Sequence, residues 1–214
     1  GLNPERLYSG EIGAVWVAAN SRRFLVTYFD NVLHEAVANV TLAPGPGVVA
    51  PCGFVPNGGT CRQRKNLGEA RIRGIELQGV LPMGEKWNFT GRYLYSDARI
   101  TESADDPALE SNRLAQTPKH TATATLRWQA TRRVQNTFQL RYSSAQFEND
   151  LNSLELDAYL VFDWSVVVAI RDDFALFISV ENVTGTKFET GRASNGLVTI
   201  GAPRLISAGI RLKL

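Results

Sequence analysis

The sequence predicts an all-β fold: an antiparallel up-and-down meander of about nine long strands that forms part of a transmembrane β-barrel. Two observations lead to this prediction. Apolar and polar residues alternate with a period of two over stretches longer than the ~5 to 6 residues of an average soluble strand. The connections between these stretches alternate between short turns and long polar loops, an asymmetry that is typical of outer-membrane barrels.

The clearest alternation covers Leu154–Arg171. Its even positions are apolar from Leu154 to Ile170, whereas its odd positions include Asp157 and Asp163. At ~3.3 Å per residue, a strand of this length extends about 56 Å. Tilted by about 45°, it would cross the ~25 Å apolar band of an outer-membrane barrel. We therefore expect its apolar face to contact lipid.

Three strands are predicted in the first part of the chain. Alternation in the second is lost around Asp30, where we expect a β-bulge, and alternation in the third shifts near Gly74. The three strands cover Arg6–Ala19, Arg23–Leu42 and Leu67–Leu81. Their apolar faces are formed by Tyr8, Ile12 and Trp16, by Phe24, Val26 and Tyr28, and by Ile75, Leu77 and Leu81.

Five further strands are predicted by the same pattern. They cover Lys86–Thr101, Lys119–Ala130, Arg133–Gln146, Phe174–Thr184 and Pro203–Leu214. Their apolar faces contain, in the same order, Trp87, Phe89, Tyr93 and Tyr95; Ala122, Ala124, Leu126 and Trp128; Val134, Phe138, Leu140 and Tyr142; Phe174, Leu176, Ile178 and Val180; and Ile206, Ala208, Ile210, Leu212 and Leu214.

The connections are sorted by length between the two edges of the predicted sheet. Short turns are expected at residues 20–22, 82–85, 131–132 and 172–173, and longer loops at 43–66, 102–117, 147–153 and 185–202. Trp87 and Trp128 lie near short turns while Tyr95 and Tyr142 lie near long loops, as the aromatic girdles of a membrane barrel require. A soluble β-sandwich also has alternating strands, but it gives no reason for this sorting.

The composition excludes other classes. A net charge of +2 over 214 residues leaves no basic footprint for nucleic acid. The longest apolar run, Ala14–Ala19, is far shorter than the ~20 residues of a membrane helix, so a helical membrane protein is excluded. The chain opens Gly-Leu-Asn-Pro without an export signal, so we expect an exported protein whose N-terminal part is missing.

The two cysteines, Cys52 and Cys61, lie in a Gly- and Pro-rich segment, where we expect a disulfide that closes a small loop in an oxidising compartment. Two ligands make a poor zinc site, so no metal and no cofactor are predicted. The two histidines, His34 and His120, belong to no recognisable nucleophile motif. We therefore predict no catalytic residues and no enzymatic activity.

Several short motifs, in this order, resemble the C-terminal part of the barrel of a TonB-dependent outer-membrane receptor. The resemblance covers essentially the whole chain. The motifs are Asn3-Pro4-Glu5 leading into Tyr8-Ser9-Gly10-Glu11-Ile12-Gly13, Asn66-Leu67-Gly68-Glu69-Ala70 with Gly74-Ile75-Glu76, Gln116-Thr117-Pro118-Lys119-His120, Val180-Glu181-Asn182-Val183, and Gly201-Ala202-Pro203-Arg204.

The resemblance implies a barrel of 22 strands with a plugged lumen. Residues 1–214 would then be its C-terminal segment, without the plug domain, the TonB-binding segment and the first strands. The expected partners are the plug of the same full-length chain, the TonB complex, and the lipid and lipopolysaccharide of a Gram-negative outer membrane. The expected cargo is a ferric siderophore; the alternatives are cobalamin or another TonB-dependent cargo, or a different class of barrel, a passive porin or an outer-membrane enzyme.

Two sets of site residues follow from the predicted strands and loops. In a closed barrel the polar face lines the lumen, because an Arg or Lys facing lipid costs ~2 to 4 kcal/mol at the midplane. The lumen- and plug-facing candidates are Glu11, Glu76, Arg92, Arg127, Arg141, Asp157, Asp163, Glu181 and Arg211. The candidates for cargo contact on external loops are Arg62, Arg64, Lys65, Phe147, Asn149, Arg192 and Asn195, of which the basic cluster could steer an anionic chelate.

Overall fold

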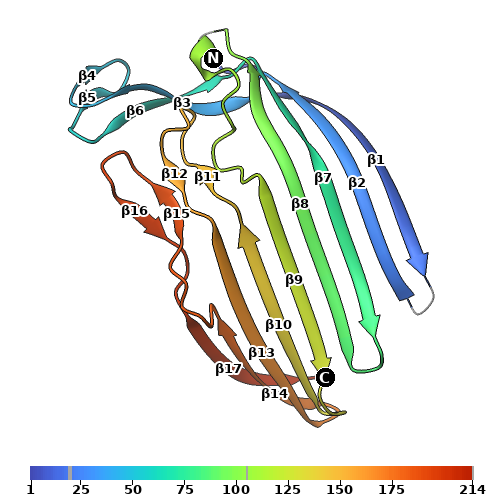
Figure 1. Cartoon of the computed structure of the whole chain (residues 1–214). Coiled ribbons are helices and arrows are strands. Elements are labelled where there is room, and N and C mark those ends of the chain that lie inside the picture. Colours follow the sequence, from blue (N-terminus) through green and yellow to red (C-terminus); the bar gives the residue numbers. More distant parts are fainter. Residues whose placement is uncertain (19–20, 105, 214) are drawn as a thin grey trace.

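The computed structural model describes residues 1–18, 21–104 and 106–213. In these residues nine long strands form one antiparallel sheet whose spatial order follows the order of the chain (Figure 1). The predicted nine-stranded meander is therefore confirmed. The strands are β1 (Arg6–Ala18), β2 (Arg22–His34), β7 (Glu69–Met83), β8 (Trp87–Glu102), β9 (His120–Gln129), β10 (Val134–Ser143), β13 (Tyr159–Arg171), β14 (Phe174–Glu181) and β17 (Leu205–Leu212).

Four short ribbons and one 3-10 turn occupy the long connections, all at the end of the sheet that is uppermost in Figure 1. Among the described residues, no helix is long and apolar enough to cross a membrane. The ribbons are β3 (Val37–Pro44) with β6 (Thr60–Asn66), β4 (Gly47–Val49) with β5 (Gly53–Val55), β11 (Gln146–Phe147) with β12 (Glu155–Leu156), and β15 (Glu189–Arg192) with β16 (Val198–Ile200); the 3-10 turn is η2 (Pro107–Leu109).

The strand register separates two faces of the sheet. Residues that are direct cross-strand partners share a face, so the pairings Ile12 with Tyr28, Tyr28 with Ile75, and Ile75 with Tyr95 define a continuous row. We call the face of this row the outer face and the opposite face the inner face. Large apolar side chains of the outer face, such as Ile12 at 73% and Ile178 at 44%, are exposed, and the polar Asn136 of this face accepts a hydrogen bond from Nε1 of Trp164. An exposed apolar sheet face of this extent requires an apolar partner.

Aromatic residues mark both ends of the apolar part of the outer face. Near the short turns Trp87 and Trp128 stack with their ring centroids 5.2 Å apart, and Trp16 lies beside Phe24. Near the long loops Tyr93 and Tyr95 approach the ring of His120, and the hydroxyl of Tyr93 lies 2.8 Å from its Nδ1. Such belts sit at the two interfaces of a bilayer.

Above the upper tyrosines the two faces exchange their polarity. Arg71 and Arg73 of β7 stand on the outer face, whereas Ala70 and Ile72 turn to the inner face. The pairing of β2 with β1 and with β7 continues through Asp30 without a shift. The predicted bulge near Asp30 is therefore wrong. The predicted shift of the alternation near Gly74 corresponds to this exchange of polarity, and the strand pairing continues through it.

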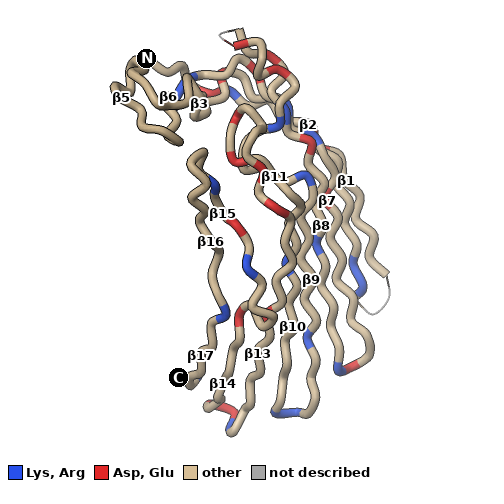
Figure 2. The backbone as a smooth tube through the Cα atoms, turned by 60° about the vertical axis from the view of Figure 1, so that its left-hand side comes forward, with Lys and Arg blue, Asp and Glu red and all other residues tan. Residues whose placement is uncertain are grey.

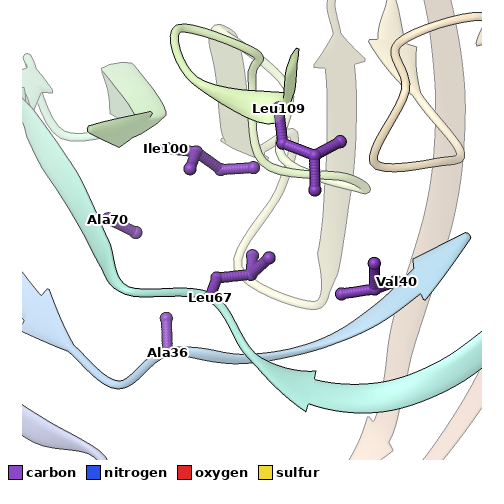
Figure 3. Packing of buried hydrophobic residues seen from close by; sticks show 6 residues of the cluster. All are labelled: Ala36, Val40, Leu67, Ala70, Ile100 and Leu109. Carbon is purple, nitrogen blue, oxygen red and sulfur yellow. The ribbon is translucent and has the colours of Figure 1, made fainter. Parts of the chain in front are cut away.

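The exchange is explained by what each face meets. Outside the bilayer the outer face is wet, so charged residues are tolerated there. The inner face meets the long loops, which form a small core with it (Figure 3). Ile100 and Leu109 are 1% and 0% exposed in this core, and Ala36 and Leu67 pack with them. A prediction that assumes one apolar face along the whole strand therefore fails where the strand leaves the membrane.

The second predicted strand ends earlier than expected. β2 stops at His34, because Glu35 adopts a left-handed backbone with φ of 56°. Residues 37–44, expected to continue the strand or begin a loop, form β3 and pair with β6 instead. The segment predicted as the loop 43–66 is thus largely an ordered two-stranded ribbon.

The predicted strand Leu154–Arg171 is also interrupted. Its first part is β12, which pairs with β11 outside the large sheet, and β13 begins at Tyr159. Leu156, expected to face lipid, is 1% exposed and is packed among the loops. Asp157, expected to face the lumen, lies between the two strands. The cause is again the boundary of the membrane, beyond which the chain bends into the loop region.

Gly74 lies on the inner face, where a side chain on β7 would collide with β8. A Cβ atom built on it would lie 1.9 Å from the carbonyl oxygen of Tyr95 and 2.8 Å from Cζ of its partner Phe29. The ring of Phe29 therefore covers the missing side chain. Phe177 covers Gly209 in the same way near the other edge of the sheet.

Candidate functional site

The inner face of the sheet is polar below the loop core. All but one of the residues predicted to face the lumen lie on it; Asp157 is the exception. Arg141 forms an ion pair with Asp163, with Nε 3.0 Å from Oδ2, and Asp163 Oδ1 also accepts the backbone N–H of Asn182 at 2.8 Å. Contact between these groups and a plug stays a prediction. The inner-face set is Glu11, Glu76, Arg92, Arg127, Arg141, Asp163, Glu181 and Arg211.

A cavity of about 370 Å³ opens among the loops on the inner side. Its walls come from the β3–β6 ribbon, from the connection between β8 and β9, and from the connection between β10 and β13. Its floor includes Leu33 and Ile100, whose positions in the register place them on the inner face. We call it the mouth cavity, and the charged residues that line it are Glu5, Arg62, Arg113, Glu148 and Asp150.

Most of the carboxylates around the mouth cavity are already engaged. Glu5 accepts the N–H of Val37 at 2.7 Å, and Glu148 accepts Nε2 of Gln116 at 3.1 Å. Arg113, in contrast, has a buried Nε with no hydrogen-bond partner among the described residues. A buried donor without a partner is rare in a native protein. Arg113 thus contributes to the lining of the cavity, while its Nε is itself buried.

Asp150 ties the ribbon to the loops. The residue is 4% exposed. Its carboxylate accepts hydrogen bonds from the N–H of Thr41 at 2.8 Å and from the hydroxyl of Thr41 at 2.6 Å. Its carbonyl oxygen accepts Nδ2 of Asn112 at 2.9 Å. One residue thus joins three segments that are far apart in the sequence, and it fixes the wall of the mouth cavity.

The far end of the ribbon meets the last long loop. The hydroxyl of Ser194 donates to the carbonyl oxygen of Gly58 at 2.6 Å and lies 2.7 Å from the hydroxyl of Thr60. In Figure 1 the ribbon extends from the top of β2 and β7 to the tip of the β15–β16 hairpin. The connections of both halves of the sheet are therefore linked above the inner face.

The basic cluster predicted on an external loop is in fact part of a strand. Arg62, Arg64 and Lys65 all belong to β6, and Arg62 alone of the three lines the mouth cavity. Phe147 is half-buried in β11, where its partner is Glu155. These four residues stay candidates for cargo contact, with Arg62 the best placed.

Asn149 closes a turn with its side chain. Its Oδ1 accepts the N–H groups of Ser153 and Leu154, both at 3.0 Å, and its Nδ2 donates to the hydroxyl of Ser153 at 2.8 Å. The residue is 6% exposed. Its side chain closes a turn, and the residue also lines the mouth cavity, so contact between Asn149 and cargo stays a prediction.

Arg192 and Asn195 lie in the β15–β16 hairpin. Arg192 is paired with Glu189, with Nη2 2.7 Å from Oε2, so its charge is largely compensated. Asn195 lies at the tip beside Gly58, and its Oδ1 accepts the N–H of Leu197 at 3.0 Å. Cys61 of β6 forms a disulfide with Cys52, which lies between β4 and β5, nine positions earlier in the sequence.

Arg113 was missed by the sequence analysis. It follows Asn112 in a polar loop without any motif, and its position on the cavity wall depends on Asn152, which accepts its N–H and donates to its carbonyl oxygen. Such pairing between two loops leaves no periodic signal. Among the described residues there is also no group of three or more His, Cys, Asp or Glu that could hold a metal ion.

Comparison with known proteins agrees with this architecture. The family described as TonB dependent receptor-like, beta-barrel matches residues 1–183. An iron-regulated outer membrane virulence protein of Vibrio cholerae is 25% identical over 188 residues, which are 85% of this chain and 28% of that protein. The chain therefore spans less than a third of the length of this relative.

Solved structures share the fold at low sequence identity. The siderophore receptor PiuA from Acinetobacter baumannii is 16% identical with a TM-score of 0.76, over 96% of this chain and 28% of that one. The ferric yersiniabactin uptake receptor FyuA from Yersinia pestis is 14% identical with a TM-score of 0.76, over 97% and 30%. The copper transporter OprC is 14% identical with a TM-score of 0.75, over 100% and 32%.

These similarities extend over nearly all of the chain and coincide with its nine-stranded sheet. The outer face then contacts the hydrocarbon of the outer membrane, and the inner face belongs to the lumen side of the barrel. The chain belongs to the TonB-dependent receptor family, as a segment of its outer-membrane β-barrel.

Proposed function

We propose that the full-length receptor binds a ferric siderophore outside the cell and imports it with energy from the TonB complex. The chain contributes lumen wall and external loops, while the plug of the same full-length chain covers the polar inner face. Solved structures with this fold are receptors for siderophores, ferric catecholates and ferric yersiniabactin, and a curated relative is iron-regulated. These proteins are receptors and transporters, so we assign no enzymatic activity.

The observation that carries the proposal is the pair of arginines at the mouth cavity. Arg62 and Arg113 are the two basic residues among those that line it. Catecholate, hydroxamate and carboxylate groups of iron chelates present anionic oxygens, which guanidinium groups bind strongly. A fold shared with the copper transporter OprC does not decide the cargo, because function depends on the site and not on the fold.

The test is cargo binding by the purified full-length receptor in detergent. Ferric catecholate, ferric hydroxamate, haem and cobalamin are titrated separately, and quenching of tryptophan fluorescence reports binding. We expect one class of ferric chelate to bind at submicromolar concentration, as for typical specific complexes near −8 kcal/mol or better. Binding of cobalamin alone, or of none of the four, would refute the iron proposal.

Two variants connect this binding to the cavity. Arg113→Gln should weaken binding of the ferric chelate by about tenfold, because it removes a charge-assisted hydrogen bond. Arg132→Gln, in the turn at the opposite end of the sheet, removes the same charge and should leave binding unchanged. Equal affinities of both variants would remove Arg113 from the site.

A further inference from the structure

The chain contains two Asn-Gly dipeptides, and the structure brings them together. Asn57-Gly58 lies between β5 and β6, and Asn195-Gly196 lies at the tip of the β15–β16 hairpin. A Cβ atom built on Gly58 would lie 2.7 Å from Cβ of Asn195, and the hydroxyl of Ser194 donates to the carbonyl oxygen of Gly58 at 2.6 Å. Asn57-Gly58 is thus part of the contact that links the ribbon to the hairpin.

This contact contains no charged side chain. Residues 43–61 and 193–203 include no Asp, Glu, Lys or Arg, and Figure 2 shows the end of the ribbon and the tip of the hairpin without charged residues. The hydrogen bonds between the two tips are made by hydroxyl and carbonyl groups of Thr60, Ser194 and Gly58. An unpaired charge is stable only when it is hydrated, so a charge created here would favour separation of the two tips.

An Asn-Gly dipeptide can convert without a catalyst. The main-chain nitrogen of the glycine attacks Cγ of the asparagine, and the glycine has no Cβ to hinder the approach. The N–Cγ bond forms, the Cγ–Nδ2 bond breaks, and the proton of the glycine N–H leaves with Nδ2 as ammonia. Water then adds to one carbonyl carbon of the resulting succinimide and breaks its bond to the ring nitrogen, which gives aspartate or isoaspartate. Water is therefore the only co-reactant.

The two dipeptides differ in the hydrogen bonds that must break before this ring can close. Asn57 is exposed, and among the described residues neither its side chain nor the N–H of Gly58 forms a hydrogen bond. In contrast, Oδ1 of Asn195 accepts the N–H of Leu197 at 3.0 Å, and the N–H of Gly196 donates to a main-chain carbonyl oxygen three residues earlier, also at 3.0 Å. Two hydrogen bonds of ordinary net strength slow such a reaction by about tenfold.

We propose that Asn57 is a site of spontaneous deamidation, and that its conversion loosens the contact between the β3–β6 ribbon and the β15–β16 hairpin. Both products carry a negative charge, which has no counter-charge in either tip. Isoaspartate also adds one carbon atom to the main chain immediately before Gly58, and this displaces the carbonyl oxygen that the hydroxyl of Ser194 binds. The state of the external loops thereby depends on the age of the receptor molecule.

The first test measures where the chain converts. The purified full-length receptor is incubated in detergent at mildly alkaline pH, and peptide mass spectrometry at successive times follows each asparagine. We expect Asn57 to convert about tenfold faster than Asn195. Asn149, whose side chain forms three hydrogen bonds, should stay unchanged. An unchanged Asn57, or conversion of Asn195 at the same rate or faster, would overturn the assignment of the site.

The second test measures the contact. Amide exchange in residues 193–197 should be faster in the converted receptor than in the unconverted one, and equal exchange would overturn the proposed loosening. Asn57→Gln keeps the amide but must close a six-membered ring, so its exchange should stay slow after the same incubation. In the matched variant Asn195→Gln, position 57 should still convert. Neither test contains cargo, so failure here is distinguishable from failure of the proposed function.

Discussion

Placing one arginine on either face of β2 tests which face meets lipid. Val26 is on the outer face, 42% exposed, and its neighbour Thr27 is on the inner face opposite Glu76. Val26 is midway between the outer charged residues Arg22 and Asp30, which are about 26 Å apart along the strand at ~3.3 Å per residue. Val26 therefore lies near the middle of the apolar band.

The magnitude follows from this depth. An arginine at the midplane of a barrel facing lipid lowers the free energy of unfolding by ~2 to 4 kcal/mol. Since each ~1.4 kcal/mol is a factor of ten, Val26→Arg should reduce the ratio of folded to unfolded receptor by a factor of about 30 to 700. Thr27→Arg places the cation on the polar inner face opposite Glu76, so a change of about 1 kcal/mol or less is expected.

The assay is urea unfolding of the full-length receptor in lipid vesicles, followed by tryptophan fluorescence. Both variants change one β-branched residue to the same cation in adjacent positions, so β-propensity and backbone effects are matched. A larger loss for Thr27→Arg than for Val26→Arg would show that the faces have been assigned the wrong way round.

Three further predictions concern the loops and the strand contacts. Asp150→Ala should lower the free energy that holds the β3–β6 ribbon to the loops by about 1 to 3 kcal/mol, because the N–H and hydroxyl of Thr41 lose their acceptor. Faster amide exchange in residues 37–44 would measure this loss, and unchanged exchange would contradict it. Gly74→Ala should lower the melting temperature through the close contact with Tyr95, whereas Gly79→Ala, whose nearest contact would be 3.4 Å, should cost less than about 1 kcal/mol. Replacing Cys52 and Cys61 with serine should destabilise the closed loop by ~2.5 to 3 kcal/mol. Proteases should then cleave within residues 44–60, while the large sheet stays protected. Loss of the whole barrel would show a wider role for the disulfide.

Within the membrane the sequence was sufficient to predict the sheet. One face of each strand must be apolar there, so alternation identifies the strands and the face that meets lipid, from Ile12 in β1 to Ile210 in β17. Short turns and aromatic belts supply the direction of the strands. These signals come from a single physical constraint, the low solubility of polar groups in hydrocarbon.

Beyond the membrane that constraint ends, and the prediction failed at the same boundary in several strands. Asp30 looked like a bulge and Leu156 like a lipid contact because a single polarity was assumed along each strand. Pairing of β3 with β6 and the hydrogen bonds of Asp150 depend on contacts between segments far apart in sequence. Neither these contacts nor the position of Arg113 produces a periodic pattern.

The most direct test of the lipid-facing assignment is oxygen accessibility of nitroxide labels placed one at a time along β14 in the vesicle-reconstituted full-length receptor. Molecular oxygen concentrates in hydrocarbon. We predict maxima at Leu176 and Ile178 and minima at Phe177 and Ser179, in a period of two. Maxima at Phe177 and Ser179, or equal accessibility at all four positions, would contradict the assignment of the apolar face to lipid.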